Sequence, residues 1–402
     1  MRVLCTLWLV LWAWACPALA ETCVQCHLRA TPGLVEQHQA GRMARAGVDC
    51  GACHGVEHQG AEDVARARMP TALTCAGCHP RQAFEFRKGK HELAWAAASA
   101  MPMWAHQPAA MTGAGLKGCS NCHKIGAKPA VEAAGHRYGN AQCDACHTRH
   151  RFSKAEARDP RACQTCHMGF DHPQWEMWSG SKHGTIWQIE GPGSTRAPTC
   201  QTCHMEQGRH AVGTGWGFLA LRLPETDAGW LKDRVTILQA LGVLDEGGKP
   251  TARLEAVQSA RMASLDRAGF DEARTRMLEV CGRCHGTRYA RRQLDAADEV
   301  VREADRVMAD AIRAVQGLYR DGLLQRPEGW LAAPDILQFY ESRSEVEREL
   351  YLMFMEYRMR AFQGAFHFNP DYSHWYGWAP LKAAAARVLE AAAQMRAGGR
   401  SR

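Results

Sequence analysis

Residues 143–150 read Cys143-Asp-Ala-Cys146-His147-Thr-Arg-His150, so two cysteines three residues apart are followed at once by a histidine. The chain has 402 residues and 18 cysteines, and every cysteine except Cys5 and Cys16 belongs to a copy of this pattern. The eight copies consist of Cys23, Cys26 and His27; Cys50, Cys53 and His54; Cys75, Cys78 and His79; Cys119, Cys122 and His123; Cys143, Cys146 and His147; Cys163, Cys166 and His167; Cys200, Cys203 and His204; and Cys281, Cys284 and His285.

The Cys-x-x-Cys-His pattern is the attachment signature of c-type haem: two thiols bind the porphyrin edge, and the histidine is the proximal ligand of the iron. The spacing is one helical turn, which brings both sulfurs and the imidazole to the ring from one segment. Zinc ribbons and disulfides also use paired cysteines, but neither needs a histidine at the fifth position. The sequence therefore predicts eight covalently bound haem c groups.

The first twenty residues have the features of a secretory signal. Met1-Arg2 supplies a positive start, an uncharged run follows from Val3 to Ala15, and Pro17-Ala-Leu-Ala20 resembles a cleavage site. We expect cleavage after Ala20 and export to the periplasm, an oxidising space. An uncleaved anchor and a lipoprotein acylated at Cys16 are the alternatives.

Charge does not indicate a nucleic-acid partner. The 49 Lys and Arg exceed the 42 Asp and Glu by a formal +7, but the basic residues are scattered among acidic ones. Each haem adds two propionates against one ferric charge, so the basic excess is explained as counter-charge for propionates.

The spare histidines leave the coordination of the irons open. Nineteen histidines minus eight in the motifs leave eleven. An iron with imidazole on both faces relays electrons, whereas an open face can bind substrate. Eleven spare histidines could fill every site, so a pure electron conduit is compatible with the count. His150 lies on the same helical face as His147, so it must serve a neighbouring haem.

The short intervals between motifs leave room for little beyond helices and loops, so we expect the porphyrins to form much of the core. The predicted fold class is all-α, a multihaem cytochrome c with a haem-packed core, long C-terminal helices and negligible β structure. The predicted domains are a signal peptide (1–20), an octahaem-binding domain (21–290) and a C-terminal helical domain (291–402) that supplies a distal ligand and oligomer contacts.

Helical periodicity is plainest after the last motif. Apolar residues recur at three- and four-residue steps from Val300 to Leu318, with Asp295 as the predicted N-cap. Ser344 and Glu347 form a capping box for a second helix. A third helix is predicted from Leu381 to Met395, ending before Gly398-Gly399. A further short helix is expected within residues 235–244.

The order of the motifs, together with Phe170-Asp171-His172, Ser181-Lys-His183-Gly and the closing Gly377-Trp378-Ala-Pro380, resembles the octahaem hydroxylamine oxidoreductase family. The resemblance implies seven bis-histidine relay haems and one catalytic haem, open on its distal face, at the fourth attachment site. His123 would be its proximal ligand, with Asp171 and His172 as acid–base residues facing the iron. The distal ligands implied for the other haems are His38, His58, His91, His150, His183, His210 and His367.

One departure from the family bears on the direction of the reaction. Hydroxylamine-oxidising members attach a tyrosine covalently to the catalytic porphyrin just before the closing Gly-Trp. Here His374 occupies the position of that tyrosine. Tyr372 or Tyr376 could reach the porphyrin only if the local backbone were shifted in register. Members without the cross-link work reductively, so the chain looks like the reductive branch.

The leading hypothesis is an enzyme that reduces nitrite to ammonium or hydroxylamine at the open haem. Hydroxylamine oxidation is the second hypothesis. The third is a non-catalytic conduit in which His106, His136 or His374 fills the eighth distal site. The resemblance also implies a redox partner, such as a membrane quinol-oxidising cytochrome, and a homotrimer.

Overall fold

The computed structural model describes residues 22–106, 118–135, 137, 140–170, 172–213, 226–254 and 267–399. Across these ranges the fold is all-α, which confirms the predicted class. The only β pairing in them is two isolated bridges, Ile125 with Ala141 and Leu244 with Pro250. The expected signal peptide, His136 and Asp171 lie outside the described residues.

The chain divides into two compact units, and the division differs from the predicted domains. The N-terminal unit comprises residues 1–68 with 149–152, and the large unit comprises residues 69–148 with 153–402. The boundary predicted at residue 290 falls inside helix α19 (Thr287–Arg320). Ala290 and Leu294 are buried, so the apolar stripe of α19 continues back almost to the last motif.

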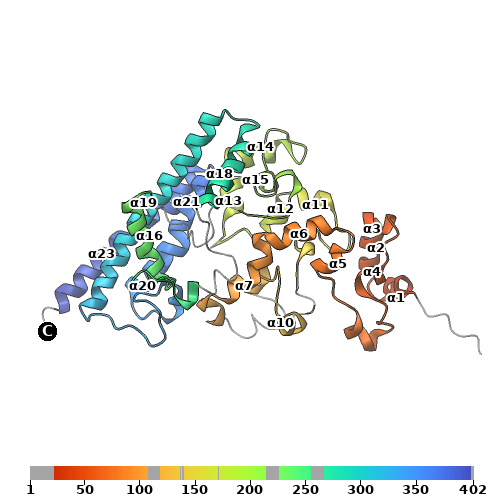
Figure 1. Ribbon diagram of the computed structural model, residues 1–402, viewed down its shortest axis with the longest axis horizontal. Helices are drawn as coiled ribbons and strands as arrows, with labels where there is room; N and C mark the ends of the chain where they lie inside the picture. The colour runs from red at the N-terminus through yellow and green to blue at the C-terminus, as the bar shows by residue number, and fades with distance from the viewer. Residues whose placement is uncertain are drawn as a thin grey trace, which may run out of the picture. The chain divides into compact units, whose positions relative to one another are not determined.

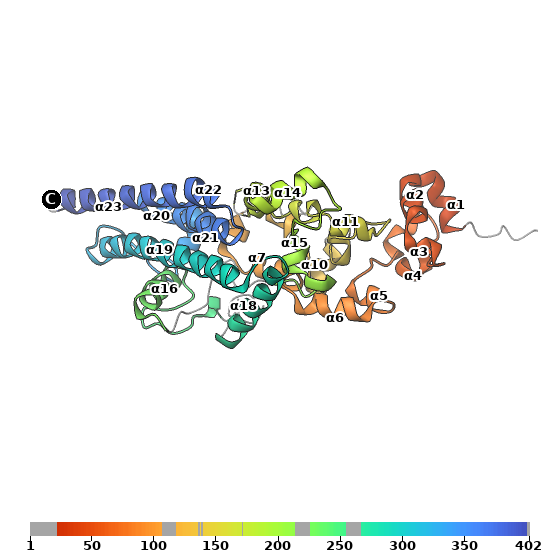
Figure 2. The same cartoon turned by 90° about the horizontal axis from the view of Figure 1, so that it is seen from above.

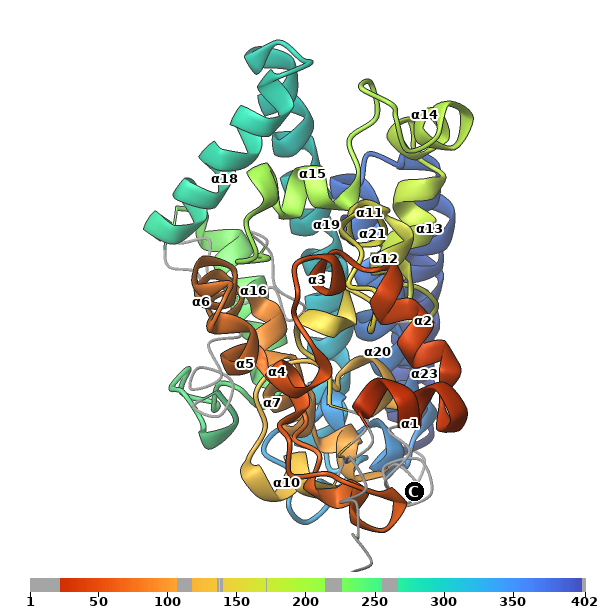
Figure 3. The ribbon, with the colours of Figure 1, turned by 90° about the vertical axis from the view of Figure 1, so that its right-hand side faces the viewer.

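The N-terminal unit is built from short helices, seen at the red end of the colour range in Figure 3. Thr22 caps the first helix through the Gln25 N–H, and Asp49 caps the fourth through the Ala52 N–H. Val35 is the one buried apolar residue among those described in this unit. The helices are α1 (Cys23–Ala30), α2 (Pro32–Ala40), α3 (Arg42–Arg45), α4 (Cys50–His54) and η1 (Ala61–Arg66).

The motif-bearing part of the large unit also consists of short helices. Its apolar clusters among the described residues are small: one centres on Phe86 and Ile125, another on Trp178 and Trp187. The elements are α5 (Ala72–Ala76), α6 (Pro80–Lys88), η2 (Lys90–Leu93), α7 (Ala94–Ser99), η3 (Pro102–His106), α9 (Cys119–Cys122), α10 (Ala130–Gly135), η4 (Cys143–Ala145), α11 (Lys154–Arg158), α12 (Arg161–Gln164), α13 (Gln174–Ser179), α14 (Lys182–Glu190), α15 (Cys200–His204) and η5 (Glu206–Gly208).

Long helices form the rest of the large unit, and α19 packs along α16, α21 and α23 (Figures 1 and 2). None of the helices in the described ranges combines the length and apolar character that a membrane span requires. The elements are α16 (Ala228–Ala240), α18 (Arg267–Gly282), α19, η6 (Ile336–Glu341), α20 (Glu345–Leu352), η7 (Met353–Arg358), α21 (Met359–Phe366), α22 (Pro370–Tyr372), η8 (Ser373–Trp378) and α23 (Ala379–Gly399).

Most of the predicted helical features are present. The apolar stripe of α19 is buried, and Ser344 and Glu347 exchange the bonds of a capping box. The predicted N-cap Asp295 is wrong, because α19 begins at Thr287 after Gly286. The helix expected within residues 235–244 is the end of the longer α16, followed by a turn.

A buried ionic cluster joins three of these helices. Asp305 of α19 lies 2.6 Å from Arg234 of α16 and 2.7 Å from Arg358 of η7, and all three side chains are 0% exposed. The Trp230 Nε1–H also donates to the Asp305 carboxylate, at 2.6 Å. One carboxylate therefore faces two guanidinium groups in a site without solvent, where removing it leaves unpaired buried charge.

We predict that Asp305→Asn lowers the free energy of unfolding by about 3–5 kcal/mol, because both guanidinium groups lose their counter-charge. Denaturant unfolding of the holoprotein, followed by far-UV circular dichroism, measures this loss. Asp310→Asn on the same helix is the control, since Asp310 is half exposed and its ion pairs contribute less than about 1 kcal/mol. Equal effects of the two substitutions would contradict the prediction.

Candidate functional site

Each Cys-x-x-Cys-His motif forms a single helical turn. In five motifs the histidine N–H donates to the carbonyl of the first cysteine at 2.8–3.0 Å, and the other three motifs lie inside α1, α4 and α15. This turn brings both sulfurs and the imidazole to one side of the segment. None of the sixteen motif cysteines is paired in a disulfide. Within the described ranges no three His, Cys, Asp or Glu side chains converge as a zinc site would require.

Six motif histidines face a second histidine across a gap of nearly constant width. The ring centroids are 6.1–6.5 Å apart in every pair. The second member of each pair is one of the expected distal ligands. The pairs are His27 with His58, His54 with His150, His167 with His91, His147 with His210, His285 with His183, and His204 with His367.

This gap fits one iron between two imidazoles. A metal–imidazole bond of about 2.0–2.1 Å on each side, with about 1.1 Å from each nitrogen to its ring centre, places the centroids about 6.3 Å apart. The six observed spacings bracket that value. The side chains present therefore fit bis-histidine haem, although ligation of each iron by these residues stays a prediction.

Hydrogen bonds hold several of these rings through Nδ1, which leaves Nε2 toward the gap. The Nδ1 atoms of His27, His54 and His367 lie 2.7–2.8 Å from the Thr31 hydroxyl and the carbonyls of Arg68 and Gln363. Metal-binding histidines use the second nitrogen in this way, which fixes both tautomer and orientation.

Two of these imidazoles are strongly desolvated. Burial lowers the pKa of His167 and of His367 to about 4. Both rings are therefore neutral at physiological pH, which is the form that binds metal.

The expected role of His38 as a distal ligand stays a prediction. His38 belongs to the N-terminal unit, and its Nε2 lies 3.0 Å from the Val48 carbonyl. The proximal histidine of the third motif, His79, belongs to the large unit and stands at the N-cap of α6.

The fourth motif has a different surrounding from the six pairs. The His123 Nδ1 lies 3.2 Å from the Ala94 carbonyl. The His172 ring centroid is 5.8 Å from His123 and also 6.4 Å from His167, which already faces His91. His172 therefore lies between two motif histidines, and Asp171, its expected acid–base companion, is outside the described residues.

The loop that carries His172 is held by residues that the sequence analysis did not identify. The Glu176 carboxylate accepts from the Gly169 N–H at 3.1 Å, and Arg360 of α21 donates to the Phe170 carbonyl at 3.2 Å. The Gln174 N–H donates to the His172 carbonyl at 2.8 Å. Sequence spacing gives no sign of the Arg360 contact, because Arg360 is 190 residues from Phe170 in the chain.

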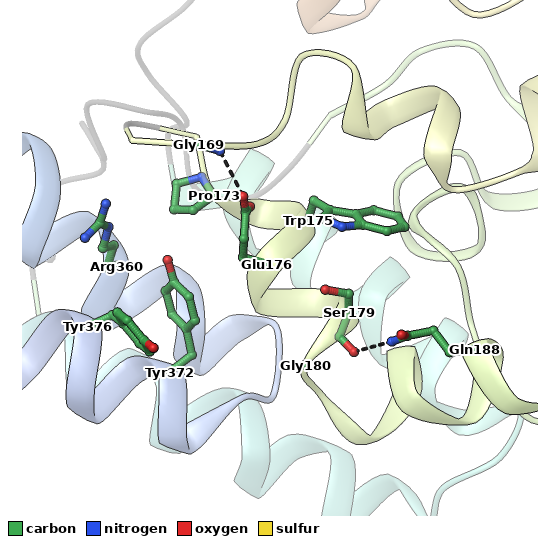
Figure 4. Close-up of a pocket in the computed structure, with 10 residues that line it drawn as sticks. All are labelled: Gly169, Pro173, Trp175, Glu176, Ser179, Gly180, Gln188, Arg360, Tyr372 and Tyr376. Carbon is green, nitrogen blue, oxygen red and sulfur yellow. Dashed lines mark hydrogen bonds between the residues drawn. The ribbon is translucent and has the colours of Figure 1, made fainter.

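A cavity of about 710 Å³ adjoins this loop (Figure 4). Glu176 and Arg360 line it together with Tyr372 and Tyr376, whose rings stack with centroids 4.8 Å apart. His374, at the register of the family's cross-linking tyrosine, packs edge-on against Trp375 at 4.7 Å. The side chain of His106, another alternative distal ligand, lies outside the described part.

Contacts between cysteine side chains show which motifs are neighbours in the large unit. Cys166 lies within hydrogen-bonding reach of Cys122, and Cys75 lies within the same reach of Cys143. Cys163 and Cys200 are in contact in the same way. The motif at Cys163–His167 thus adjoins both the fourth motif, Cys119–His123, and the seventh, Cys200–His204.

Residues 19–214 and 255–328 match the family model described as "Seven times multi-haem cytochrome CxxCH", and these ranges contain all eight motifs. Among curated proteins, the chain is similar to a probable nitrite reductase-hydroxylamine oxidoreductase fusion protein of Kuenenia stuttgartiensis. The two are 26% identical over 94% of this chain. The chain spans about half (52%) of the length of that relative.

Two solved structures resemble the fold closely. A chain of the Kuenenia stuttgartiensis reducing HAO-like protein complex superposes with a TM-score of 0.70 and 26% identity, covering 94% of this chain and 85% of that one. A hypothetical multiheme protein superposes with a TM-score of 0.67 and 20% identity, covering 94% and 96%. The second likeness concerns the fold alone.

We predict that Asp63→Asn raises the reduction potential of one haem in the N-terminal unit. The Asp63 carboxylate accepts from the His58 Nδ1 at 2.8 Å, which makes the imidazole a stronger donor to ferric iron. The Gly60 N–H, with further bonds from His58 and Gln59, lowers the pKa of Asp63 to about 2. The carboxylate's effect is therefore complete above about pH 4, its ordinary pKa, and is lost only as the pH falls through about 2.

A spectroelectrochemical titration near pH 7 measures this shift. Glu62→Gln is the matched control, because Glu62 is an exposed neighbouring carboxylate. A potential that is unchanged in Asp63→Asn, or changed equally in the control, would rule out a role for this bond.

Proposed function

Because the chain belongs to the multihaem cytochrome family defined by repeated CxxCH motifs, we propose that it is an octahaem enzyme that reduces nitrite to ammonium or hydroxylamine. The reaction takes place at the haem held by Cys119, Cys122 and His123. Members of this family bind haem c covalently at these motifs, and this chain has eight of them. The proposed location is the periplasm, after cleavage at Ala20.

The observation that carries the proposal is the place of His172. Six motif histidines lie in pairs with distal histidines, whereas His123 faces a loop residue that is also close to His167. A loop held by Glu176, Gln174 and Arg360 can keep the His172 imidazole near a substrate without making that imidazole an axial ligand of either iron. Such a histidine is suited to proton transfer.

Proton supply is the main task of these side chains. Reduction of nitrite to ammonium consumes six electrons and eight protons, and reduction to hydroxylamine consumes four electrons and five protons. A haem iron with an exchangeable coordination position supplies the nitrogen chemistry. His172 and Asp171 hold and deliver protons, while Ala94 orients the His123 ring through Nδ1.

Electrons would reach the fourth motif through its neighbour at Cys163–His167. The contact between Cys122 and Cys166 brings the two attachment sites together. The motif at Cys163–His167 in turn adjoins the motif at Cys200–His204 through Cys163 and Cys200. A redox partner, such as a membrane quinol-oxidising cytochrome, would supply electrons to this series of haems. The proposed assembly is a homotrimer.

The reductive direction is supported by residue 374, which is a histidine at the family's cross-linking register. It is also supported by the similarity to a complex named as reducing. The alternative direction, hydroxylamine oxidation, uses the same haem and would require Tyr372 or Tyr376 to become linked to it. Tryptic mapping of the holoprotein would detect a tyrosine peptide retained on haem.

A second candidate function follows from one distance. The His123–His172 spacing of 5.8 Å is only slightly below that of the six pairs. If His172 were the sixth ligand of the fourth haem, no site would be open, and the protein would be an electron conduit.

Electron paramagnetic resonance separates these two candidates. We predict a high-spin ferric signal in the oxidised holoprotein, changed by nitrite, besides the low-spin relay haems. Eight low-spin centres, with a high-spin signal appearing only in His172→Ala, would establish the conduit instead.

We predict that His172→Ala with Asp171→Ala keeps all eight haems but lowers nitrite turnover with reduced viologen about a hundredfold or more, the range of general acid–base catalysis. Glu190→Gln is the control, because Glu190 is exposed and pairs with the surface residue Arg196. Turnover equal to that of the control would remove the two residues from the mechanism.

Intact mass of the purified protein tests the cofactor count and the cleavage site together. We predict a chain beginning at Glu21 that carries the mass of eight haems. A mass matching fewer haems, or a retained N-terminus, would overturn the corresponding part of the proposal.

A further inference from the structure

Two glutamine side chains form a hydrogen-bonded bridge that starts at the proximal imidazole of the sixth motif. The His167 Nδ1 lies 3.3 Å from Gln174 Oε1, and Gln174 Nε2 donates to Gln363 Oε1 at 2.8 Å. The backbone carbonyl of Gln363 is in turn 2.8 Å from the Nδ1 of His367. The bridge thus connects helices α13 and α21 at residues that touch a ligand of the sixth haem and a ligand of the seventh.

Metal binding gives this bridge a single polarity. When His167 binds iron through Nε2, its Nδ1 must carry the proton and must find an acceptor. Gln174 can accept only with Oε1, which turns its NH₂ group toward Gln363 and makes Gln363 Oε1 the last acceptor. With both amides reversed, Gln174 would present a donor to His167, and the iron-binding tautomer would be lost.

The acceptor on His167 differs in strength from those on other ligands. His58 donates to the Asp63 carboxylate, whereas His54 and His123 face backbone carbonyls. The Gln174 side chain offers a neutral amide oxygen, which its donor contact to Gln363 polarises. This side-chain acceptor can also be removed or altered by mutation, whereas a backbone carbonyl cannot.

The position of the sixth motif makes the reduction potential of its haem important for the distribution of electrons. Its cysteines contact both Cys122 of the fourth motif and Cys200 of the seventh. An iron at this junction exchanges electrons with more than one neighbour, so its potential controls how electrons divide among them.

We propose that Gln174, fixed by Gln363, is a positioning residue that holds the iron-binding tautomer of His167 and sets the reduction potential of the haem at Cys163–His167. The inference rests on haem attachment at this motif and not on which substrate the fourth haem reduces. Failure of nitrite reduction would leave it intact, because its test measures potentials and spectra.

The test compares two substitutions of opposite chemistry in the holoprotein. Gln174→Leu removes the acceptor, weakens the imidazole as a donor, and raises the potential of one haem. Gln174→Glu places a carboxylate next to the Nδ1 atom of His167 and lowers the reduction potential of the same haem. Gln363 can reverse its amide so that its NH₂ group donates to this carboxylate. The expected change in the reduced-to-oxidised ratio at fixed applied potential is about tenfold, or about 59 mV for one electron.

Spectroelectrochemical titration and low-spin paramagnetic resonance of the same samples provide the readout. One component of the titration should move and one low-spin signal should shift its g values, with eight haems retained. Gln363→Leu should move the same component in the direction of Gln174→Leu but less, because the Gln174 amide loses only its outer partner. Gln188→Leu is the control, since Gln188 is exposed and donates to the Ser179 carbonyl without touching an imidazole.

Opposite shifts in the two Gln174 variants support the proposal, because packing damage alone would displace the potential in one direction. Shifts of the same sign, or no shift beyond that of Gln188→Leu, would overturn it. Gln174→Glu is nearly isosteric with the natural residue, so it keeps the test decisive if Gln174→Leu fails to bind haem.

Discussion

An iron with two axial imidazoles requires its ligands to approach from opposite sides at a fixed separation, and the fold is organised around meeting that requirement repeatedly. Six pairs of histidines meet it within 0.4 Å of one another, although their partners come from different helices and loops. Short helices suffice in this region, because each motif needs one turn and bound haems would supply the apolar surface that an aliphatic core supplies elsewhere. The aliphatic core lies instead among α16, α19, α20 and α23.

The features that could be predicted from the sequence are those encoded locally. A motif of five residues identifies the attachment sites, periodic apolar residues identify the stripe of α19, and Ser344 with Glu347 identifies a helix start. The start of α19 was missed, because Asp295 is a good cap in isolation and the buried Ala290 and Leu294 extend the helix past it. Tertiary burial here outweighs a local preference.

The parts of the site that could not be predicted depend on long-range approach. The contacts of Gln174 with Gln363 and of Arg360 with Phe170 follow from the meeting of α13 and α21 beside the His172 loop, whereas Glu176 bonds locally to Gly169. The same approach gives His172 its place near both His123 and His167. The substrate site proposed at this junction would have a candidate proton donor and a second haem attachment motif beside it.

The N-terminal unit includes residues 149–152 as well as its own first segment, and His150 completes the pair with His54. About a hundred residues separate the two histidines along the chain. The second axial ligand expected for the haem of the second motif would therefore become available only after this long loop has closed.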